Sequence, residues 1–123
     1  MQRMSTLDDF FAAWSEGAED ERLRLVRSAV APDGTYLDPM TPEPLVGPDA
    51  VAAYVGAFTD NAPGASARVV DRQDRHGVAR ATVEFRMADG HVQHGQYFVE
   101  FADDDRLARM IGFVGLGEPG SDT

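Results

Sequence analysis

The chain contains no cysteine, so disulfide bonds, thiolate nucleophiles and cysteine-ligated metal sites are all excluded. Lysine is also absent, which removes Schiff-base chemistry and a lysine general base. No apolar run approaches the roughly 20 residues of a membrane-spanning helix. The segment Met1–Ser5 lacks the apolar stretch of a secretory signal. We therefore expect a cytoplasmic protein with no membrane partner.

Positive charge is scarce as well: 11 basic residues stand against 21 acidic ones, and the net charge is −10. A strongly acidic surface repels phosphate backbones, so we expect no nucleic-acid partner. The length of 123 residues fits one domain, and 43% hydrophobic content is enough to build its core. We expect a single domain over residues 1–123, with a core at about 5–115 and a loose tail at 116–123.

Three helices are predicted in the first half of the chain. The first starts near Ser5 and is ended by Gly17. Its apolar face shows the i, i+3, i+4, i+7 spacing in four large residues: Leu7, Phe10, Phe11 and Trp14. The second begins near Asp20 and ends before a turn at residues 31–34. The third begins at Gly47-Pro48, because proline is favoured at the first helical position.

The second half of the chain has the alternating period of β-strands. Four strands are predicted, at residues 65–73, 78–88, 91–101 and 107–115, and a short one precedes them at 35–37. The joints between the four are too short for crossovers, so we expect antiparallel hairpins. Helices on one face of such a sheet give an α+β fold, a cone-shaped curved antiparallel sheet packed on three N-terminal helices around an apolar hollow.

Asp38 follows the short strand and precedes Pro39, which must stop the strand because proline donates no ladder hydrogen bond. A carboxylate held there between apolar side chains would open into the hollow if Tyr36 also points inward. Burial would penalise its charged form and raise its pKa toward neutrality, as a general base requires. The alternative is an Asp that only caps the following turn, and the local sequence favours this cap.

A longer pattern extends from Asp38 into the third predicted helix. It resembles, without a gap, the ketosteroid isomerase run D-P-x-x-x-E-P-x-x-G-x-x-A: Asp38-Pro39, Glu43-Pro44, Gly47 and Ala50. Segments 11–17 and 99–115 resemble the first helix and the last two strands of these enzymes. The layout is similar to the nuclear-transport-factor-2-like (NTF2-like) superfamily, which includes ketosteroid isomerases and SnoaL-like polyketide cyclases. The resemblance covers most of residues 5–115 and implies a cystatin-like roll.

The resemblance also implies catalytic roles. Asp38 occupies the place of the base that moves a proton between carbons near a ketone. The isomerase oxyanion hole consists of a Tyr on the first helix and a protonated Asp on the penultimate strand. Phe10 stands at the place of that Tyr and Tyr97 at the place of the Asp. A phenol can donate a hydrogen bond to a developing enolate, so Asp38 and Tyr97 are the candidate catalytic residues.

The other candidate site residues are expected to bind the substrate, with core packing as the alternative for each. The hydroxyls of Tyr54 and Tyr36 would position the ligand. Four residues would form the apolar wall: Phe10, Trp14, Phe58 and Met110. His91 and His94 fall on opposite faces of a strand and cannot share a ligand, so no metal is expected. No phosphate loop or dinucleotide fingerprint is present, so no cofactor is expected either.

Two functions remain open from the sequence. The first is a small cofactor-independent enzyme of isomerase or cyclase type, acting on a flat, apolar, steroid-like or polyketide-like carbonyl compound. The second is a non-catalytic module that binds a small ligand or serves for dimerisation. Alternating charges on the polar strand face are typical of a solvated surface or of a dimer interface between sheets. We expect a homodimer through the sheet.

Overall fold

The computed structural model describes residues 2–117, with side chains from Thr6 onward. Within this range the helices are α1 (Gln2–Ala12), which continues into a 3-10 turn at Ala13–Ser15, α2 (Glu19–Ala29) and α3 (Pro48–Asn61). The strands are β1 (Val30–Leu37), β2 (Leu45–Val46), β3 (Ser66–Arg75), β4 (Val78–Arg86), β5 (Val92–Phe101) and β6 (Leu107–Val114). Most of the expected tail at 116–123 lies outside the described residues. No helix in residues 2–117 combines the length and the apolar character needed to cross a membrane.

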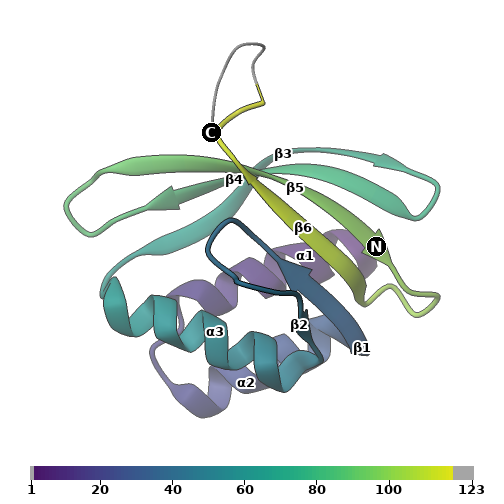
Figure 1. Ribbon diagram of the computed structural model, residues 1–123, viewed down its shortest axis with the longest axis horizontal. Coiled ribbons are helices and arrows are strands. Elements are labelled where there is room, and N and C mark those ends of the chain that lie inside the picture. The colour runs from purple at the N-terminus through teal and green to yellow at the C-terminus, as the bar shows by residue number, and fades with distance from the viewer. Residues whose placement is uncertain (1, 118–123) are drawn as a thin grey trace.

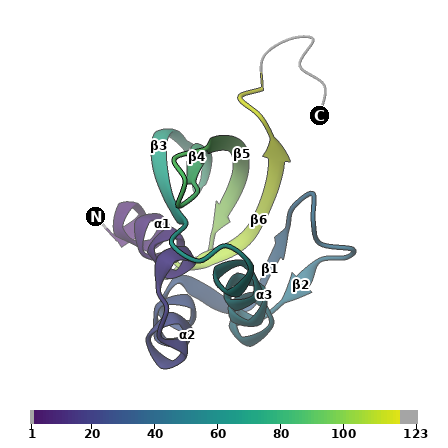
Figure 2. The same ribbon diagram turned by 90° about the vertical axis from the view of Figure 1, so that its left-hand side faces the viewer.

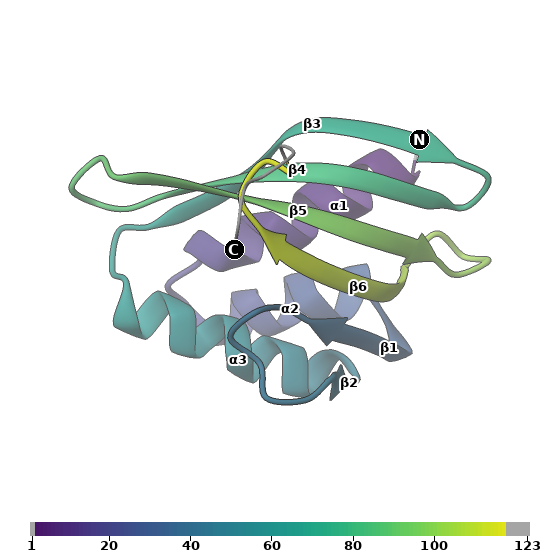
Figure 3. The same ribbon diagram turned by 45° about the horizontal axis from the view of Figure 1, so that its top comes forward.

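The strands of the described range form one curved sheet in the order β2-β1-β6-β5-β4-β3 (Figure 1). Strands β3 to β6 pair antiparallel as a meander, which confirms the predicted hairpins. β1 runs parallel to β6 and antiparallel to the short edge strand β2. Figures 2 and 3 show the three helices gathered on the concave side of the sheet. The expected α+β fold is confirmed.

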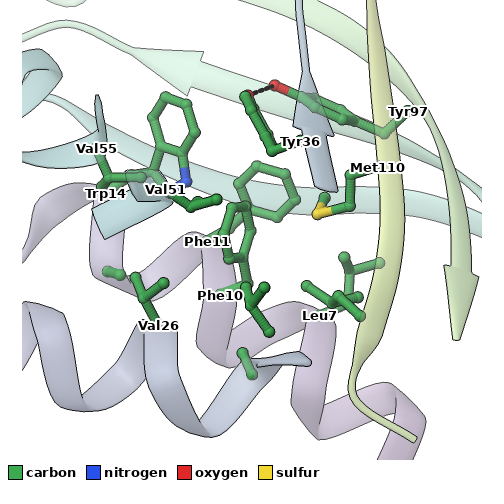
Figure 4. Close-up of a cluster of buried hydrophobic side chains, with 14 of the residues drawn as sticks. Leu7, Phe10, Phe11, Trp14, Val26, Tyr36, Val51, Val55, Tyr97 and Met110 are labelled. Atoms are coloured by element: carbon green, nitrogen blue, oxygen red, sulfur yellow. Dashed lines mark hydrogen bonds between the residues drawn. The ribbon is translucent and has the colours of Figure 1, made fainter. Parts of the chain in front are cut away.

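The hydrophobic core fills the space between the helices and the concave face of the sheet (Figure 4). The predicted apolar face of the first helical segment is at most 3% exposed: Leu7, Phe10, Phe11 and Trp14. From β5, Tyr97 and Val99 enter the same core, while Phe98 between them is 36% exposed on the outer face. Strand alternation therefore separates a buried inner face from an exposed outer face.

Two boundaries differ from the sequence prediction. α1 begins at Gln2, before the predicted start near Ser5. Residues 31–34, predicted as a turn, belong to β1, which starts directly after α2. The register between β1 and β6 shifts between Val30 and Thr35, which marks a bulge. The Pro-Asp-Gly signal thus marks an irregularity within a strand and not a reversal of the chain.

Gly34 allows β1 to pass close to the start of β6. A Cβ at this position would stand 2.6 Å from the backbone oxygen of Leu107 and 2.9 Å from Cγ1 of Val30. The Gly34 carbonyl also accepts a hydrogen bond from the N–H of Gly47 at 2.8 Å, just before α3. Gly34 therefore allows β1 to pack closely on β6 and connects β1 by a hydrogen bond to the residue before α3.

We predict that Gly34→Ala destabilises the protein by about 1–3 kcal/mol, because the added methyl group must displace backbone atoms. Denaturant unfolding followed by circular dichroism measures this change. Gly17→Ala is the matched control, since no atom lies within 4 Å of a Cβ at that position. Equal unfolding midpoints for the two variants would contradict the role assigned to Gly34.

Candidate active site

Asp38 lies where the chain leaves β1 and turns toward β2. The Met40 N–H donates to Asp38 Oδ1 at 2.9 Å, and the Thr41 N–H donates to the Asp38 carbonyl at 3.1 Å. The buried Thr41 hydroxyl accepts from the Asp38 N–H and donates to its carbonyl, each at 3.1 Å. Asp38 therefore does cap the turn. Because the cap uses one lone pair of one oxygen, the carboxylate retains further acceptor sites.

Two tyrosine hydroxyls donate hydrogen bonds to the same carboxylate. Tyr36, two residues earlier on β1, points to the same side of the strand, and its hydroxyl is 2.7 Å from Asp38 Oδ2. The hydroxyl of Tyr54 on α3 lies 2.8 Å from both Oδ1 and Oδ2 and shares its single proton between them. Together with the Met40 N–H, three donors hold a partly buried carboxylate in one orientation.

Tyr97 completes the cluster from β5, which is separated from β1 by β6 in the sheet. Its hydroxyl lies 2.8 Å from the hydroxyl of Tyr36 (Figure 4). The chain has three tyrosines, and the fold brings all of them from β1, α3 and β5 to one carboxylate. Tyr36 stands in the middle, between Asp38 on one side and Tyr97 on the other.

A cavity of about 490 Å³ lies beside the cluster, which is within the usual size of small-molecule sites. Five of the predicted site residues line it: Asp38, Tyr97, Tyr54, Trp14 and Phe58. Sequence reasoning missed further apolar lining residues: Pro39, Met40, Phe85 and Met87. The alternation of β4 could have identified Phe85 and Met87, because both follow the inward-facing Val83 at intervals of two. Met40 carries no such signal.

Three predicted ligand-contacting residues do not line the cavity. Phe10 and Met110 are 0% and 2% exposed and belong to the core. Tyr36 is 1% exposed and reaches the site only through the hydrogen bonds of its hydroxyl. The ring of Phe10 packs against that of Tyr36 with centroids 5.9 Å apart. The core-packing alternative therefore describes the positions of Phe10 and Met110.

One strand glycine, also missed in the sequence, makes room for the Tyr97 ring. Gly112 pairs with Tyr97 across β5 and β6. A Cβ there would stand 2.7 Å and 2.9 Å from Tyr97 ring atoms and 3.3 Å from Cβ of Asp38. Glycine inside a strand is a known sign of such close approach.

Burial raises the pKa of all three tyrosines. Desolvation is the largest cause at Tyr36, and the neighbouring Tyr97 and Asp38 raise its pKa further. At Tyr54 desolvation comes first, followed by donation to Asp38, which favours the neutral phenol. At Tyr97 desolvation outweighs the hydrogen bond with Tyr36, which lowers the pKa. All three therefore remain neutral hydroxyl groups at physiological pH.

The two histidines of interest occupy different environments. His94 lines the cavity, whereas His91 is exposed just before β5, where its backbone N–H donates to Asp89 Oδ1 at 2.9 Å. Among the described side chains, no group of three or more histidines and carboxylates is placed to hold a metal ion. The titratable groups that the described residues bring to the site are one carboxylate, three phenols and the His94 imidazole.

The sequence profile of the SnoaL-like domain family matches residues 7–110. The chain belongs to the SnoaL-like family. This family is part of the NTF2-like superfamily, so the resemblance seen in the sequence is confirmed. A comparison with curated proteins found no significant match.

Solved structures share the fold of this SnoaL-like protein. A candidate isomerase of the SnoaL-like family from Agrobacterium tumefaciens is 24% identical with a TM-score of 0.83, covering 94% of this chain and 98% of that one. A candidate SnoaL-like polyketide cyclase from Jannaschia is 13% identical with a TM-score of 0.73, covering 91% and 84%. A candidate ketosteroid isomerase from Kribbella flavida is 19% identical with a TM-score of 0.68, covering 99% and 84%. At these identities the comparisons show the fold alone.

Because the chain has only three tyrosines, a spectrophotometric titration of phenolate absorbance reports on this site without interference. We predict a native titration midpoint above the ordinary tyrosine value of 10.0. The raised pKa values stabilise the fold fully below about pH 10, the unfolded value, and this contribution is lost as the pH rises beyond it. The same titration in denaturant is the control. A native midpoint that coincides with the denatured one would contradict the buried cluster.

Proposed function

We propose that the protein is a small cofactor-independent enzyme in which Asp38 moves a proton next to a carbonyl group, in an isomerase or cyclase type of reaction. The observation that carries this proposal is that Asp38 and Tyr97 line one largely apolar cavity. A base and a hydroxyl donor beside a common ligand are what enolisation needs. The family and the fold are consistent with the proposal, because SnoaL-like and isomerase-like proteins share this architecture.

The surroundings of Asp38 suit a base that must be held in place and still accept a proton. Three protons are directed at the carboxylate, from Tyr36, Tyr54 and the Met40 N–H. A carboxylate offers about four acceptor positions, so one position remains for an incoming proton. Fixing the carboxylate in this way removes much of the entropic cost of aligning it with a substrate carbon.

The cavity also indicates the class of substrate. Its walls are mostly aromatic and aliphatic, and Asp38 is the one carboxylate among the described residues that line it. A volume of about 490 Å³ accommodates a flat ring system, and apolar walls favour one with few polar groups. We therefore propose a steroid-like or polyketide-like carbonyl compound, with its oxygen near Tyr97 and its acidic carbon near Asp38.

Ligand binding without turnover is the second candidate function. Phe10 is apolar at the place of the isomerase Tyr, and its side chain is fully buried in the core. The site therefore lacks the second donor that the isomerases aim at the oxyanion. One missing donor costs about 10²–10³ in rate at comparable sites, which a binding protein can tolerate.

Deuterium exchange separates the two functions. We predict that the protein catalyses exchange of solvent deuterium into a β,γ-unsaturated ketone, and that Asp38→Asn lowers the rate at least about 100-fold because the amide cannot act as the base. Mass spectrometry of a ketone panel measures the exchange. Asp33→Asn, at an exposed carboxylate on β1, is the matched control and should exchange at the wild-type rate. Equal rates for Asp38→Asn and the wild type would exclude Asp38 as the base.

The outer face of the sheet supports the proposed homodimer. A depression of about 730 Å³ on this face is lined by polar residues and by partly exposed apolar ones: Phe98, Phe113, Val114 and Leu116. A contiguous apolar patch of this kind is typical of a protein interface. The charged neighbours of the patch include Asp71 and Arg80, which allow complementary pairing across a two-fold axis.

We predict that Phe98→Glu converts the dimer into a monomer, because it places an unpaired charge in the interface. Phe98 does not line the cavity beside Asp38, so the fold and the site should remain. Sedimentation velocity measures the oligomeric state. Val46→Glu is the control, since Val46 is 63% exposed on the edge strand β2. A wild-type protein that sediments as a monomer at micromolar concentration would contradict the proposed dimer.

A further inference from the structure

We propose that Asp38, Tyr36 and Tyr97 form a hydrogen-bond relay, in which protonation of Asp38 turns the Tyr97 hydroxyl proton from Tyr36 toward the cavity. Its part in a reaction rests on the proposed function, whereas the relay itself follows from the contacts. Three oxygen atoms form a row: Oδ2 of Asp38 lies 2.7 Å from the Tyr36 hydroxyl, which lies 2.8 Å from the Tyr97 hydroxyl. Only Asp38 and Tyr97, at the two ends, line the cavity.

When Asp38 is ionised, the number of available protons determines which oxygen of the row donates each hydrogen bond. A carboxylate can only accept, so the single proton of Tyr36 is donated to Oδ2. The contact between the two tyrosines then needs the proton of Tyr97, which must point toward Tyr36. In this state Tyr97 offers a ligand only a lone pair. The resting enzyme therefore has no Tyr97 donor for a ketone oxygen.

Protonation of Asp38 at Oδ2 reverses the direction in which the hydrogen bonds of the row are donated. The Met40 N–H donates to Oδ1, and the Tyr54 hydroxyl, which lies 2.8 Å from both oxygens, can donate to Oδ1 alone, so Oδ2 is the oxygen free to become a hydroxyl. The new O–H rotates about its C–O bond to donate to Tyr36, Tyr36 rotates its proton toward Tyr97, and Tyr97 is left with a proton to direct into the cavity. No bond within either tyrosine breaks, because each hydroxyl only rotates about its C–O bond.

Because Tyr36 in the middle of the row is enclosed, the orientation of the Tyr97 hydroxyl proton depends on the protonation of Asp38. Tyr36 is 1% exposed and does not line the cavity, so its hydroxyl has no access to bulk water as a substitute partner. The raised pKa values of both phenols keep their protons in place. Among the described residues lining the cavity, the remaining titratable groups are Tyr54, which faces the carboxylate, and His94.

In the proposed reaction this relay couples the removal of the proton from carbon to the stabilisation of the negative charge on the carbonyl oxygen. The C–H bond breaks, its proton forms the O–H bond at Oδ2, and the electron pair becomes the C=C bond as negative charge moves to the carbonyl oxygen. The rotation of the new O–H toward Tyr36 then releases the Tyr97 proton for that oxygen. The hydrogen bond is thus made to the enolate and not to the ketone, which is the differential binding that lowers a barrier. Tyr36 is the positioning residue of this step.

A double-mutant cycle with 4-nitrophenolate as an enolate mimic tests the relay. Asp38→Asn places an amide donor at the position of Oδ2, because Oδ1 must continue to accept from the Met40 N–H. We expect Asp38→Asn to strengthen 4-nitrophenolate binding about tenfold more in the presence of Tyr36 than in a Tyr36→Phe background, as one hydrogen bond to a charged group implies. Tyr54→Phe is the matched control, because it removes a phenol outside the row and should preserve the full gain.

An equal gain in the Tyr36→Phe background would overturn the relay, because the effect would then be only the loss of a negative charge. The hydroxyl protons give a second readout by NMR in the absence of a ligand. Asp38→Asn should shift the hydroxyl resonances of both Tyr36 and Tyr97, and a shift confined to Tyr36 would also overturn the relay. Both experiments measure binding or proton position, so a failed deuterium exchange refutes the proposed function and leaves the relay to these tests.

Discussion

The hydrogen bond between Tyr36 and Asp38 is the interaction on which the site depends, because it joins the core of the protein to the one carboxylate among the described residues that line the cavity. Tyr36 packs against Phe10 in the core, and its hydroxyl contacts both Asp38 and Tyr97. Tyr54 supports the same carboxylate from α3. A buried polar cluster of this kind is stable only when its members are paired, and here each hydroxyl has a partner.

Close approaches between neighbouring strands position the members of this cluster. β1 leaves α2 without a loop and runs parallel to β6, which places the end of β1 against the strand that carries Gly112. The absence of a side chain at Gly112 allows the Tyr97 ring and Asp38 to approach each other. The absence of a side chain at Gly34 likewise allows β1 and β6 to approach each other at the other end of the pair. Small residues inside strands thus set the distances within the site.

Regular patterns in the sequence predicted the regular parts of the structure. The spacing of Leu7, Phe10 and Trp14 identified the buried helical face, and short joints identified the antiparallel meander. The Asp38-Pro39 pair led to the correct turn. The Tyr36–Tyr97 contact could not be predicted, because it joins residues 61 positions apart and depends on how far the sheet curves. Phe10 and Met110 were assigned to the wall for the same reason, since periodicity shows which face is inward but not how deep a side chain lies.

The proposed function requires that one ligand lies between Asp38 and Tyr97, and a crystal structure with a bound phenolic ligand tests this most directly. We predict that the ligand oxygen lies about 2.7–3.1 Å from the Tyr97 hydroxyl. We also predict that a ring carbon next to the oxygenated one lies about 3–3.5 Å from the Asp38 carboxylate. A ligand bound on the outer face of the sheet, or one inside the cavity with its oxygen away from Tyr97, would contradict the account.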